Sequence, residues 1–230
     1  MTGIPAVRDH LALALDVGDP TGALELARRH SATFGVAKVG LELWAAGGPA
    51  VVEEVATTGM DVFLDLKLHD IPTTVGRAVT ALGRLPIRYL TVHASGGPAM
   101  CSAAVEGLAA SREGGSRVTV LGVTVLTSDA DTGAFDDRLR VASQTCGGVV
   151  CSVHEASRVR AAAPDLTIVT PGIRLGGTAS HDQARVADPR AALEAGSDLL
   201  VVGRTVTAAT DPDAAAAAVA RQVADVLGVS

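Results

Sequence analysis

Residues 61–74 read DVFLDLKLHDIPTT, and this stretch combines the two patterns that decide the fold. Residues 61–67 are a mostly apolar run of strand length, which is typical of a buried β-strand. Pro72 and the two threonines after it are typical of the first turn of a helix. The stretch therefore predicts a strand that leads through a short loop into a helix.

The same pattern recurs along the whole chain: a short apolar run, a polar break and then a longer alanine-rich stretch with helical spacing. Eight strands, each followed by a helix, are the number that closes a (β/α)8 barrel. We therefore predict an α/β fold, a compact TIM barrel that forms a single domain over residues 1–230. The predicted strands are residues 11–17, 34–40, 61–67, 88–94, 117–126, 148–153, 166–173 and 198–204.

Proline and aspartate mark several predicted helix starts, at Asp19-Pro20, Pro49, Pro72 and Asp211-Pro212. The last of these opens an alanine-rich helix that is expected to cover the outside of the barrel. Residues 128–148 barely suffice for the fifth helix, so we expect a loop and a short helix there.

The composition and charge of the chain argue against several classes of protein. The chain has 230 residues, of which 48% are hydrophobic and 19% charged, with a formal net charge of −6 and no run of Lys or Arg. This balance argues against a nucleic-acid polymer as partner. The charged N-terminus lacks the apolar core of a signal peptide, and no apolar run reaches the roughly 20 residues of a membrane span. We expect a cytoplasmic protein.

The three cysteines, Cys101, Cys146 and Cys151, are an odd number without C-x-x-C spacing. They favour neither a disulfide framework nor a zinc site, and they fit a reducing compartment. Cys151 is expected to be a core thiol and Trp44 a packing residue.

Polar residues gather where the predicted strands end, and in a TIM barrel those ends form the active site. Residues 65–70 carry a D-x-K-x-x-D cluster, in which Asp65 and Lys67, two apart on a strand, should project to the same side, with Asp70 in the loop beyond. The alternative for this cluster is a surface ion-pair group, but its neighbours are apolar. The strand-end residues are Asp16, Lys38, Asp65, Lys67, His93, Thr127, Gly172, Arg174, Gly203 and Arg204.

Taken alone, some of these residues have simpler interpretations. Asp16 can be a helix-capping aspartate, and Lys38 can be a lysine that extends from a strand edge to solvent. His93 is more readily explained as a hydrogen-bonded histidine at a strand end than as an acid or base. Only their convergence on one mouth of the barrel favours a functional role for Asp16 and Lys38.

The seventh and eighth strands end in a pattern that predicts a phosphate site. Gly203 and Arg204, in VVGRTVT at residues 201–207, follow the last strand at a helix start, and Gly172 and Arg174 follow the strand before. Barrel phosphate sites commonly lie after these two strands. The alternative is a simple glycine turn with a solvent-facing Arg204.

Motifs along nearly the whole chain resemble those of the orotidine 5'-phosphate decarboxylase family. FLDLKLHDIPTTV, at residues 63–75, resembles the family's active-site segment. The other motifs follow in the family's order: LALDV, VAKVGLELW, VHASGG, VTVLTS, GVVCSVHEA, TPGIR, HDQARVADP and VVGRTVT. Residues 128–148 are shorter than is usual in the family.

The resemblance implies decarboxylation of orotidine 5'-monophosphate to UMP in de novo pyrimidine biosynthesis, with no metal or other cofactor. Lys67 would donate the proton to C6, within a charged network that also contains Lys38, Asp65 and Asp70. The resemblance further implies a homodimer, in which Asp70, Ile71 and Thr74 reach the neighbouring subunit's site. The remaining substrate contacts would be Asp16 and Lys38 at the ribose, Thr127 at the pyrimidine, and Arg174, Gln183, Gly203 and Arg204 at the phosphate, with residues 175–183 as a lid.

Two alternatives remain at this point. The first is a Mg²⁺-dependent sugar-phosphate decarboxylase or synthase of the same superfamily, in which a glutamate near position 38 supports the metal; Lys38 argues against it. The second is a catalytically silent barrel that binds nucleotides.

Overall fold

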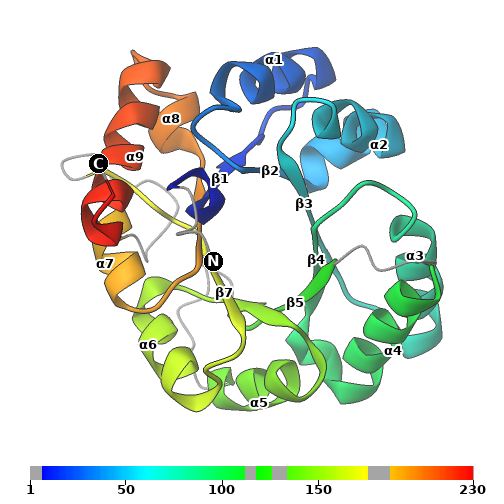
Figure 1. Ribbon diagram of the computed structural model, residues 1–230. Helices are drawn as coiled ribbons and strands as arrows, with labels where there is room; N and C mark the ends of the chain where they lie inside the picture. The colour runs from blue at the N-terminus through cyan, green and yellow to red at the C-terminus, as the bar shows by residue number, and fades with distance from the viewer. Residues whose placement is uncertain (1–6, 112–117, 126–133, 176–186, 230) are drawn as a thin grey trace, which may run out of the picture.

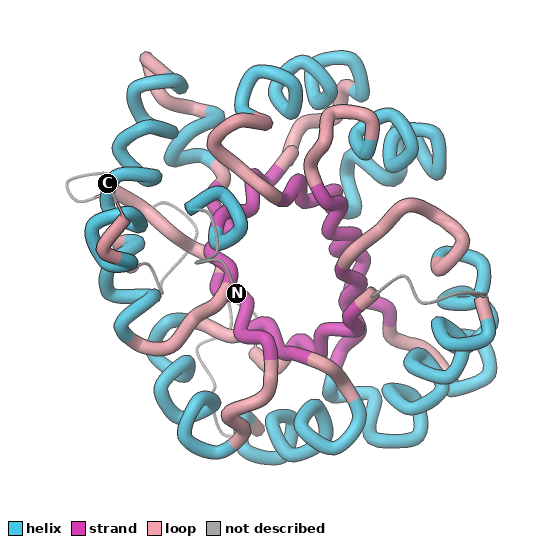
Figure 2. Tube along the Cα trace, viewed as in Figure 1, coloured by secondary structure: helices cyan, strands magenta, loops and turns pink. Residues whose placement is uncertain are grey.

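The computed structural model describes residues 7–111, 118–125, 134–175 and 187–229. Its strands are parallel and pair in chain order, and β8 pairs with β1, so that the sheet closes into a barrel. Figure 2 shows this ring of strands from one end. The strands are β1 (Leu11–Ala14), β2 (Val36–Gly40), β3 (Asp61–Leu68), β4 (Tyr89–His93), β5 (Thr119–Val123), β6 (Gly148–Val150), β7 (Thr167–Thr170) and β8 (Leu199–Val202).

Helices surround the barrel on the outside, as Figure 1 shows. The α-helices are α1 (Pro20–His30), α2 (Leu41–Ala56), α3 (Pro72–Leu82), α4 (Gly97–Ala110), α5 (Phe135–Thr145), α6 (Val153–Ala162), α7 (Pro189–Glu194), α8 (Arg204–Thr207) and α9 (Pro212–Leu227). Two 3₁₀ turns, η1 (Val7–His10) and η2 (Ala94–Gly96), precede β1 and α4. The predicted (β/α)8 barrel is thus confirmed.

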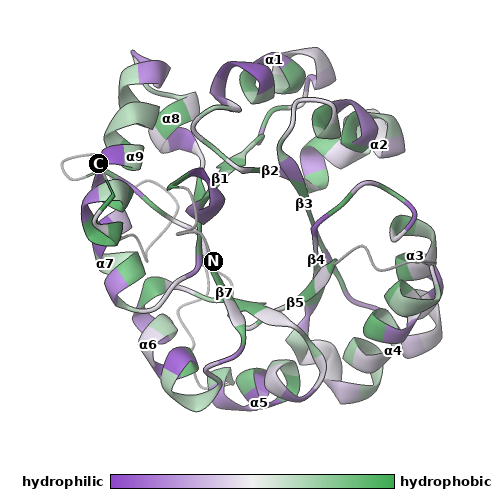
Figure 3. Ribbon diagram, in the orientation of Figure 1, coloured by the Kyte–Doolittle hydropathy of each residue, from purple (hydrophilic) through white to green (hydrophobic). Residues whose placement is uncertain are grey.

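Hydrophobic side chains pack on both faces of the barrel, as parallel sheets covered by helices require. Figure 3 shows the barrel strands as largely hydrophobic and the helices as mixed. The outer layer, between strands and helices, includes Leu13, Val39 and Leu64. The interior layer consists of Ala12, Ala14, Val36, Phe63, Leu121, Val123, Val150, Val169, Leu199 and Val201, with Tyr89 packed against it.

The sequence-predicted helix starts are confirmed at three of four places. Asp19 caps α1 by accepting hydrogen bonds from the backbone N–H groups of Thr21 and Gly22, and Asp211 caps α9 in the same manner. Pro72 is the first residue of α3.

The prediction for Pro49 holds in part: a helical segment begins at Pro49, but α2 as a whole begins eight residues earlier at Leu41. Gly48 has φ 56° and ψ −146°, a conformation that interrupts the helix, and Pro49 opens the segment after this kink. The fifth helix, which was expected to be short, is α5 with 11 residues, the same length as α1 and α3.

The three cysteines are buried free thiols. Burial raises the pKa of the Cys151 thiol to about 12, as expected for a core residue. Trp44 is partly buried and packs against the core, which confirms its predicted role. None of the described helices is long and apolar enough to cross a membrane.

Candidate active site

A cavity of about 550 Å³ opens at the carboxyl ends of the strands. This volume lies within the range of sites for small molecules. Its walls come from both ends of the chain, which the closure of the barrel brings together. The lining residues are Ala14, Asp16, Lys38, Gly40, Leu41, Phe63, Asp65, Lys67, Val123, Val125, Val150, Pro171, Gly172, Ile173, Arg174, Val201, Gly203, Arg204 and Thr205.

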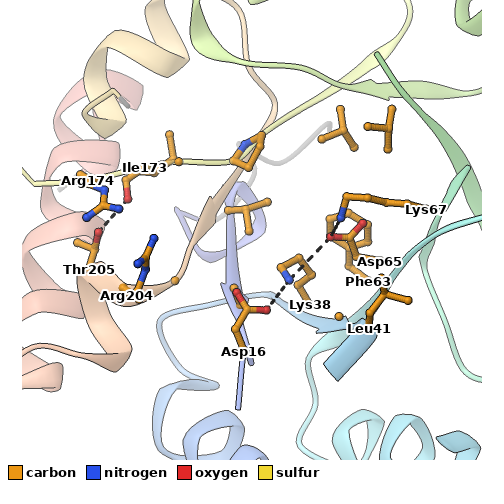
Figure 4. Close-up of a pocket in the computed structure, with 18 of the residues that line it drawn as sticks. Asp16, Lys38, Leu41, Phe63, Asp65, Lys67, Ile173, Arg174, Arg204 and Thr205 are labelled. Atoms are coloured by element: carbon orange, nitrogen blue, oxygen red, sulfur yellow. Dashed lines mark hydrogen bonds and ion pairs between the residues drawn. The ribbon is translucent and has the colours of Figure 1, made fainter. Parts of the chain in front are cut away.

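Four charged side chains form an array of alternating sign along one wall of this cavity (Figure 4). Lys38 Nζ donates to Asp16 Oδ1 at 2.8 Å and lies 3.8 Å from Asp65 Oδ2. Lys67 Nζ donates to the same Asp65 oxygen at 2.7 Å. The array therefore presents two ammonium groups that share one carboxylate.

Burial decides between the alternatives that the sequence left open. The side chains of Lys38 and Asp65 are each 11% exposed, and that of Lys67 is 29% exposed. The pair of Asp65 and Lys67 is therefore no surface ion pair, whereas Asp70 of the same cluster is exposed. The capping role is also wrong for Asp16, because Asp19 caps α1.

The backbone at Lys67 departs from regular strand geometry. Its φ is 50°, and Lys67 is the only described residue other than glycine with a positive φ. Between the registered pairs Leu64–Leu90 and Leu68–Val92, β3 advances four residues and β4 only two, so β3 contains a bulge. A non-glycine residue held in this region costs about 1–3 kcal/mol. Asp65 and Lys67 do meet, as predicted, but through this bulge and not through simple strand alternation.

Thr91, which the sequence analysis did not single out, holds the bulge from the neighbouring strand. Its Oγ1 accepts a hydrogen bond from the backbone N–H of Lys67 at 2.8 Å and donates one to Asp65 Oδ1 at 2.9 Å. Thr91 is 0% exposed. It does not line the cavity itself.

Gly40, at the end of β2, leaves space for the ion pair between Lys38 and Asp16 because it has no side chain. A Cβ at this position would lie 3.2 Å from Lys38 Nζ and 3.3 Å from Asp16 Oδ1. Both distances are tighter than ordinary contact, so any larger residue would press on the pair between Lys38 and Asp16.

The opposite wall carries the predicted phosphate residues. Arg174 and Arg204 both line the cavity on the side away from Asp65 and Lys67, as Figure 4 shows. Thr205 Oγ1 donates to the carbonyl of Ile173 at 2.9 Å, which ties the loop after β7 to the start of α8. Arg174 is half-buried, and Arg204 is exposed at the mouth.

The remaining predicted residues lie apart from the cavity. Asp70, Ile71 and Thr74, at the start of α3, are exposed and do not line the cavity of their own chain. Thr127, Gln183 and most of the predicted lid lie outside the described residues.

His93, at the end of β4, lies beside the array and not in the cavity lining. Its ring centroid is 5.5 Å from that of His69. Burial, together with the neighbouring His69 and Lys67, lowers the pKa of His93. The histidine therefore favours its neutral form and adds little positive charge to this end of the barrel.

Lys38 and Lys67 are the only lysines in the chain, and its other side-chain cations are arginine and histidine. Both line the cavity. Among the described residues, no group of three or more His, Cys, Asp or Glu is placed to hold a metal ion.

Fold and cavity together define a TIM-barrel enzyme, with charged groups at the strand ends where barrel active sites lie. The model of the family described as "Orotidine 5'-phosphate decarboxylase / HUMPS family" matches residues 9–219. The chain therefore belongs to this family. The family description carries two names, so individual relatives are needed to distinguish between them.

Curated relatives carry the first of these names. The chain is 46% identical to the orotidine 5'-phosphate decarboxylase of Thermobifida fusca, over 93% of this chain and 95% of that protein. It is 42% identical to the enzyme of the same name from Pseudomonas entomophila, over 95% and 98%. The crystal structure of orotidine 5'-phosphate decarboxylase from Lactobacillus acidophilus matches with a TM-score of 0.77 and 33% identity, over 93% of this chain and 98% of that one.

Proposed function

We propose that this chain removes CO2 from orotidine 5'-monophosphate to give UMP, as a step of pyrimidine biosynthesis. The observation that carries the proposal is the alternating array of Asp16, Lys38, Asp65 and Lys67, which lines one cavity together with two arginines. Relatives at 41–46% identity carry the name of this activity.

The two walls suit the two ends of such a nucleotide. Arg174 and Arg204 supply guanidinium groups, which bind phosphate oxygens with strong charge-assisted hydrogen bonds. Gly203, beside Arg204, lines the same part of the cavity and belongs to the proposed phosphate site. In this arrangement Asp16 and Lys38 contact the ribose hydroxyls, and the base reaches the end of the cavity at Asp65 and Lys67. The proposal also includes Thr127 at the pyrimidine and Gln183 at the phosphate.

The reaction breaks the bond between C6 and the carboxylate carbon. The electron pair stays on C6, and CO2 leaves. Lys67 then donates a proton from Nζ to C6, which completes UMP, and the resulting amine takes up a proton from solvent. Because the carbanion has no conjugated acceptor, preorganised positive charge must stabilise it.

Each neighbour of Lys67 has a part in this step. Lys67 Nζ is fixed by Asp65 Oδ2 at 2.7 Å, so its charge needs little reorganisation as the reaction proceeds. Asp65 places a negative charge beside the departing carboxylate, and the loss of CO2 relieves that repulsion. Lys38, 3.8 Å from the same oxygen, keeps Asp65 in place. The ammonium of Lys67 supplies the positive charge, and we propose that no metal or cofactor is required.

The direct test of this function is the loss of orotidine 5'-monophosphate absorbance in buffer treated with a chelator. We expect turnover that added Mg²⁺ leaves unchanged. Activity on a sugar phosphate that appears only with Mg²⁺ would assign the chain to the metal-dependent group of the superfamily. Absence of turnover on both substrates would indicate a nucleotide-binding barrel.

We further propose that the active enzyme is a homodimer in which Asp70, Ile71 and Thr74 complete the partner's site. Ile71 is 66% exposed and Leu41, at the cavity, is 58% exposed; these are the exposed large hydrophobic residues in the described part of the chain. Leu41 directly follows β2 and Ile71 lies between β3 and α3, so both are exposed at the end of the barrel where the proposed interface lies. Asp70 lies three residues after Lys67, at this same end.

Mixing two inactive variants tests the shared site. Homodimers of Lys67→Ala and of Asp70→Ala each lack one essential group in both sites. After subunit exchange, half of the dimers are mixed, and one of the two sites in each is intact, so about a quarter of wild-type activity should return. The measurement is the rate of decarboxylation before and after exchange in dilute denaturant.

A matched control uses two groups that the same subunit supplies to each active site. Mixing Lys67→Ala with Lys38→Ala should restore nothing, because no combination places both lysines in one site. The proposed arrangement would be contradicted if both mixtures recovered the same activity. It would also be contradicted if the mixture of Lys67→Ala with Asp70→Ala recovered no activity.

A further inference from the structure

We propose that Thr91 is a positioning residue for the decarboxylation, and that its hydroxyl fixes both Asp65 and the backbone of Lys67. This inference rests on the proposed function of the charged array. Thr91 lies in the middle of β4 and outside the cavity lining, so it acts through its two neighbours and not on the substrate.

The direction of both hydrogen bonds follows from the donors available. The backbone N–H of Lys67 can only donate, so Thr91 Oγ1 accepts this bond of 2.8 Å. The hydroxyl hydrogen is then directed to Asp65 Oδ1 at 2.9 Å. One hydroxyl thus ties together the backbone of the proposed proton donor and the carboxylate that orients its side chain.

In this arrangement the two carboxylate oxygens of Asp65 have different partners. Oδ1 is taken by Thr91, and Oδ2 alone faces Lys67 Nζ at 2.7 Å and Lys38 Nζ at 3.8 Å. Rotation of the carboxylate would break the bond to Thr91. The hydroxyl therefore selects the rotamer in which one oxygen serves both ammonium groups.

The bulge in β3 makes this support necessary. Lys67 has φ 50°, and its N–H lies where the pairing of β3 with β4 shifts, between Leu64 and Leu68. A backbone N–H that is removed from water without a partner is costly, and Thr91 supplies the partner for this part-buried N–H. Tyr89, two residues earlier in β4, packs against the barrel interior, so Thr91 points to the same face.

The interior of the barrel explains why a threonine fits here. Val36, Phe63 and Tyr89 belong to, or pack against, its apolar interior layer. The residues two positions later on the same three strands are Lys38, Asp65 and Thr91. Thr91 is thus the third member of a buried polar layer directly above an apolar one, and its methyl group can pack while its hydroxyl bonds.

The test compares Thr91→Val, which keeps the shape and removes the hydroxyl, with Thr91→Ser, which keeps the hydroxyl. For Thr91→Val we expect kcat to fall about 10- to 100-fold, as for loss of a hydrogen bond to a charged group, with KM changed by less than about threefold. Thr91→Ser should restore kcat to within about threefold of wild type. Thr170→Val is the matched control, because Thr170 is also 0% exposed in a strand and its hydroxyl bonds Ser197, outside the cavity.

A second readout does not depend on activity. Because the chain has only two lysines, ¹⁵N-lysine labelling gives two backbone amide signals, and the Lys38→Arg variant assigns them. The Lys67 amide should be protected from hydrogen exchange in wild type and Thr91→Ser and should lose protection in Thr91→Val. It should stay protected in Thr170→Val.

The two readouts separate the possible failures. Wild type that does not turn over orotidine 5'-monophosphate would defeat the proposed function. An active wild type with an unchanged kcat in Thr91→Val, or with equal losses in Thr91→Val and Thr91→Ser, would overturn the role of the Thr91 hydroxyl. An unchanged Lys67 amide in Thr91→Val would overturn it as well.

Discussion

Replacing Lys67 with alanine is expected to lower kcat by at least about 10⁴-fold, the largest effect of any single substitution in this chain. Two contributions are lost together. General acid catalysis typically contributes about 10²–10⁴-fold, and one preorganised electrostatic group about 10²–10³-fold. Lys67 supplies both in the proposed mechanism. Single-turnover loss of orotidine 5'-monophosphate absorbance is the measurement.

A second variant separates the charge from the proton. Lys67→Arg keeps a positive charge near Asp65, but guanidinium does not give up its proton at neutral pH. It should remain at least about 10²-fold below wild type. Both variants should still bind UMP in calorimetry, since the arginines of the opposite wall are unchanged. A Lys67→Ala enzyme within tenfold of wild type would contradict the assignment of Lys67.

Replacing Arg204 with alanine should lower kcat/KM by about 30- to 1000-fold. The loss of a charge-assisted hydrogen bond to a phosphate costs about 2–4 kcal/mol, and every 1.4 kcal/mol corresponds to a factor of ten. The effect should appear in kcat as well as in KM, because binding energy from a remote group orients the reacting centre.

The nucleoside orotidine, which lacks the phosphate, provides the control for this variant. If Arg204 acts on the phosphate, wild type and Arg204→Ala should decarboxylate orotidine at the same slow rate. Arg190→Ala, an exposed arginine paired with Glu194 on α7, should behave as wild type on both substrates. A loss on orotidine equal to the loss on the nucleotide would place Arg204 at some other contact.

The sequence was sufficient to predict the barrel, because a (β/α)8 fold repeats one local pattern eight times. Seven of the eight strands lie within their predicted ranges, and β3 exceeds its range by the single residue Leu68. The convergence of Lys38, Asp65 and Lys67 could also be predicted, because parallel strands bring their carboxyl ends to one edge.

The support behind the array could not be predicted in the same way. The conformation of Lys67 depends on how β3 is registered against β4, and that register is a tertiary property. Thr91 gave no signal of its own, because threonine is common in strands and its partners lie in a different strand. The clearest available clue was that Thr91 lies two residues after Tyr89 on the same strand. The two side chains therefore point to the same face, which places the Thr91 hydroxyl inside the barrel.

The confinement of both lysines to the cavity has a practical consequence for handling the protein. Reagents that acylate or alkylate primary amines find, apart from the α-amino group, only Lys38 and Lys67 as targets. Coupling at either lysine would disrupt the charged array, and the three cysteines are buried. Exposed carboxylates on the outer helices, such as Glu53 and Glu54 of α2, offer attachment points that leave both lysines intact.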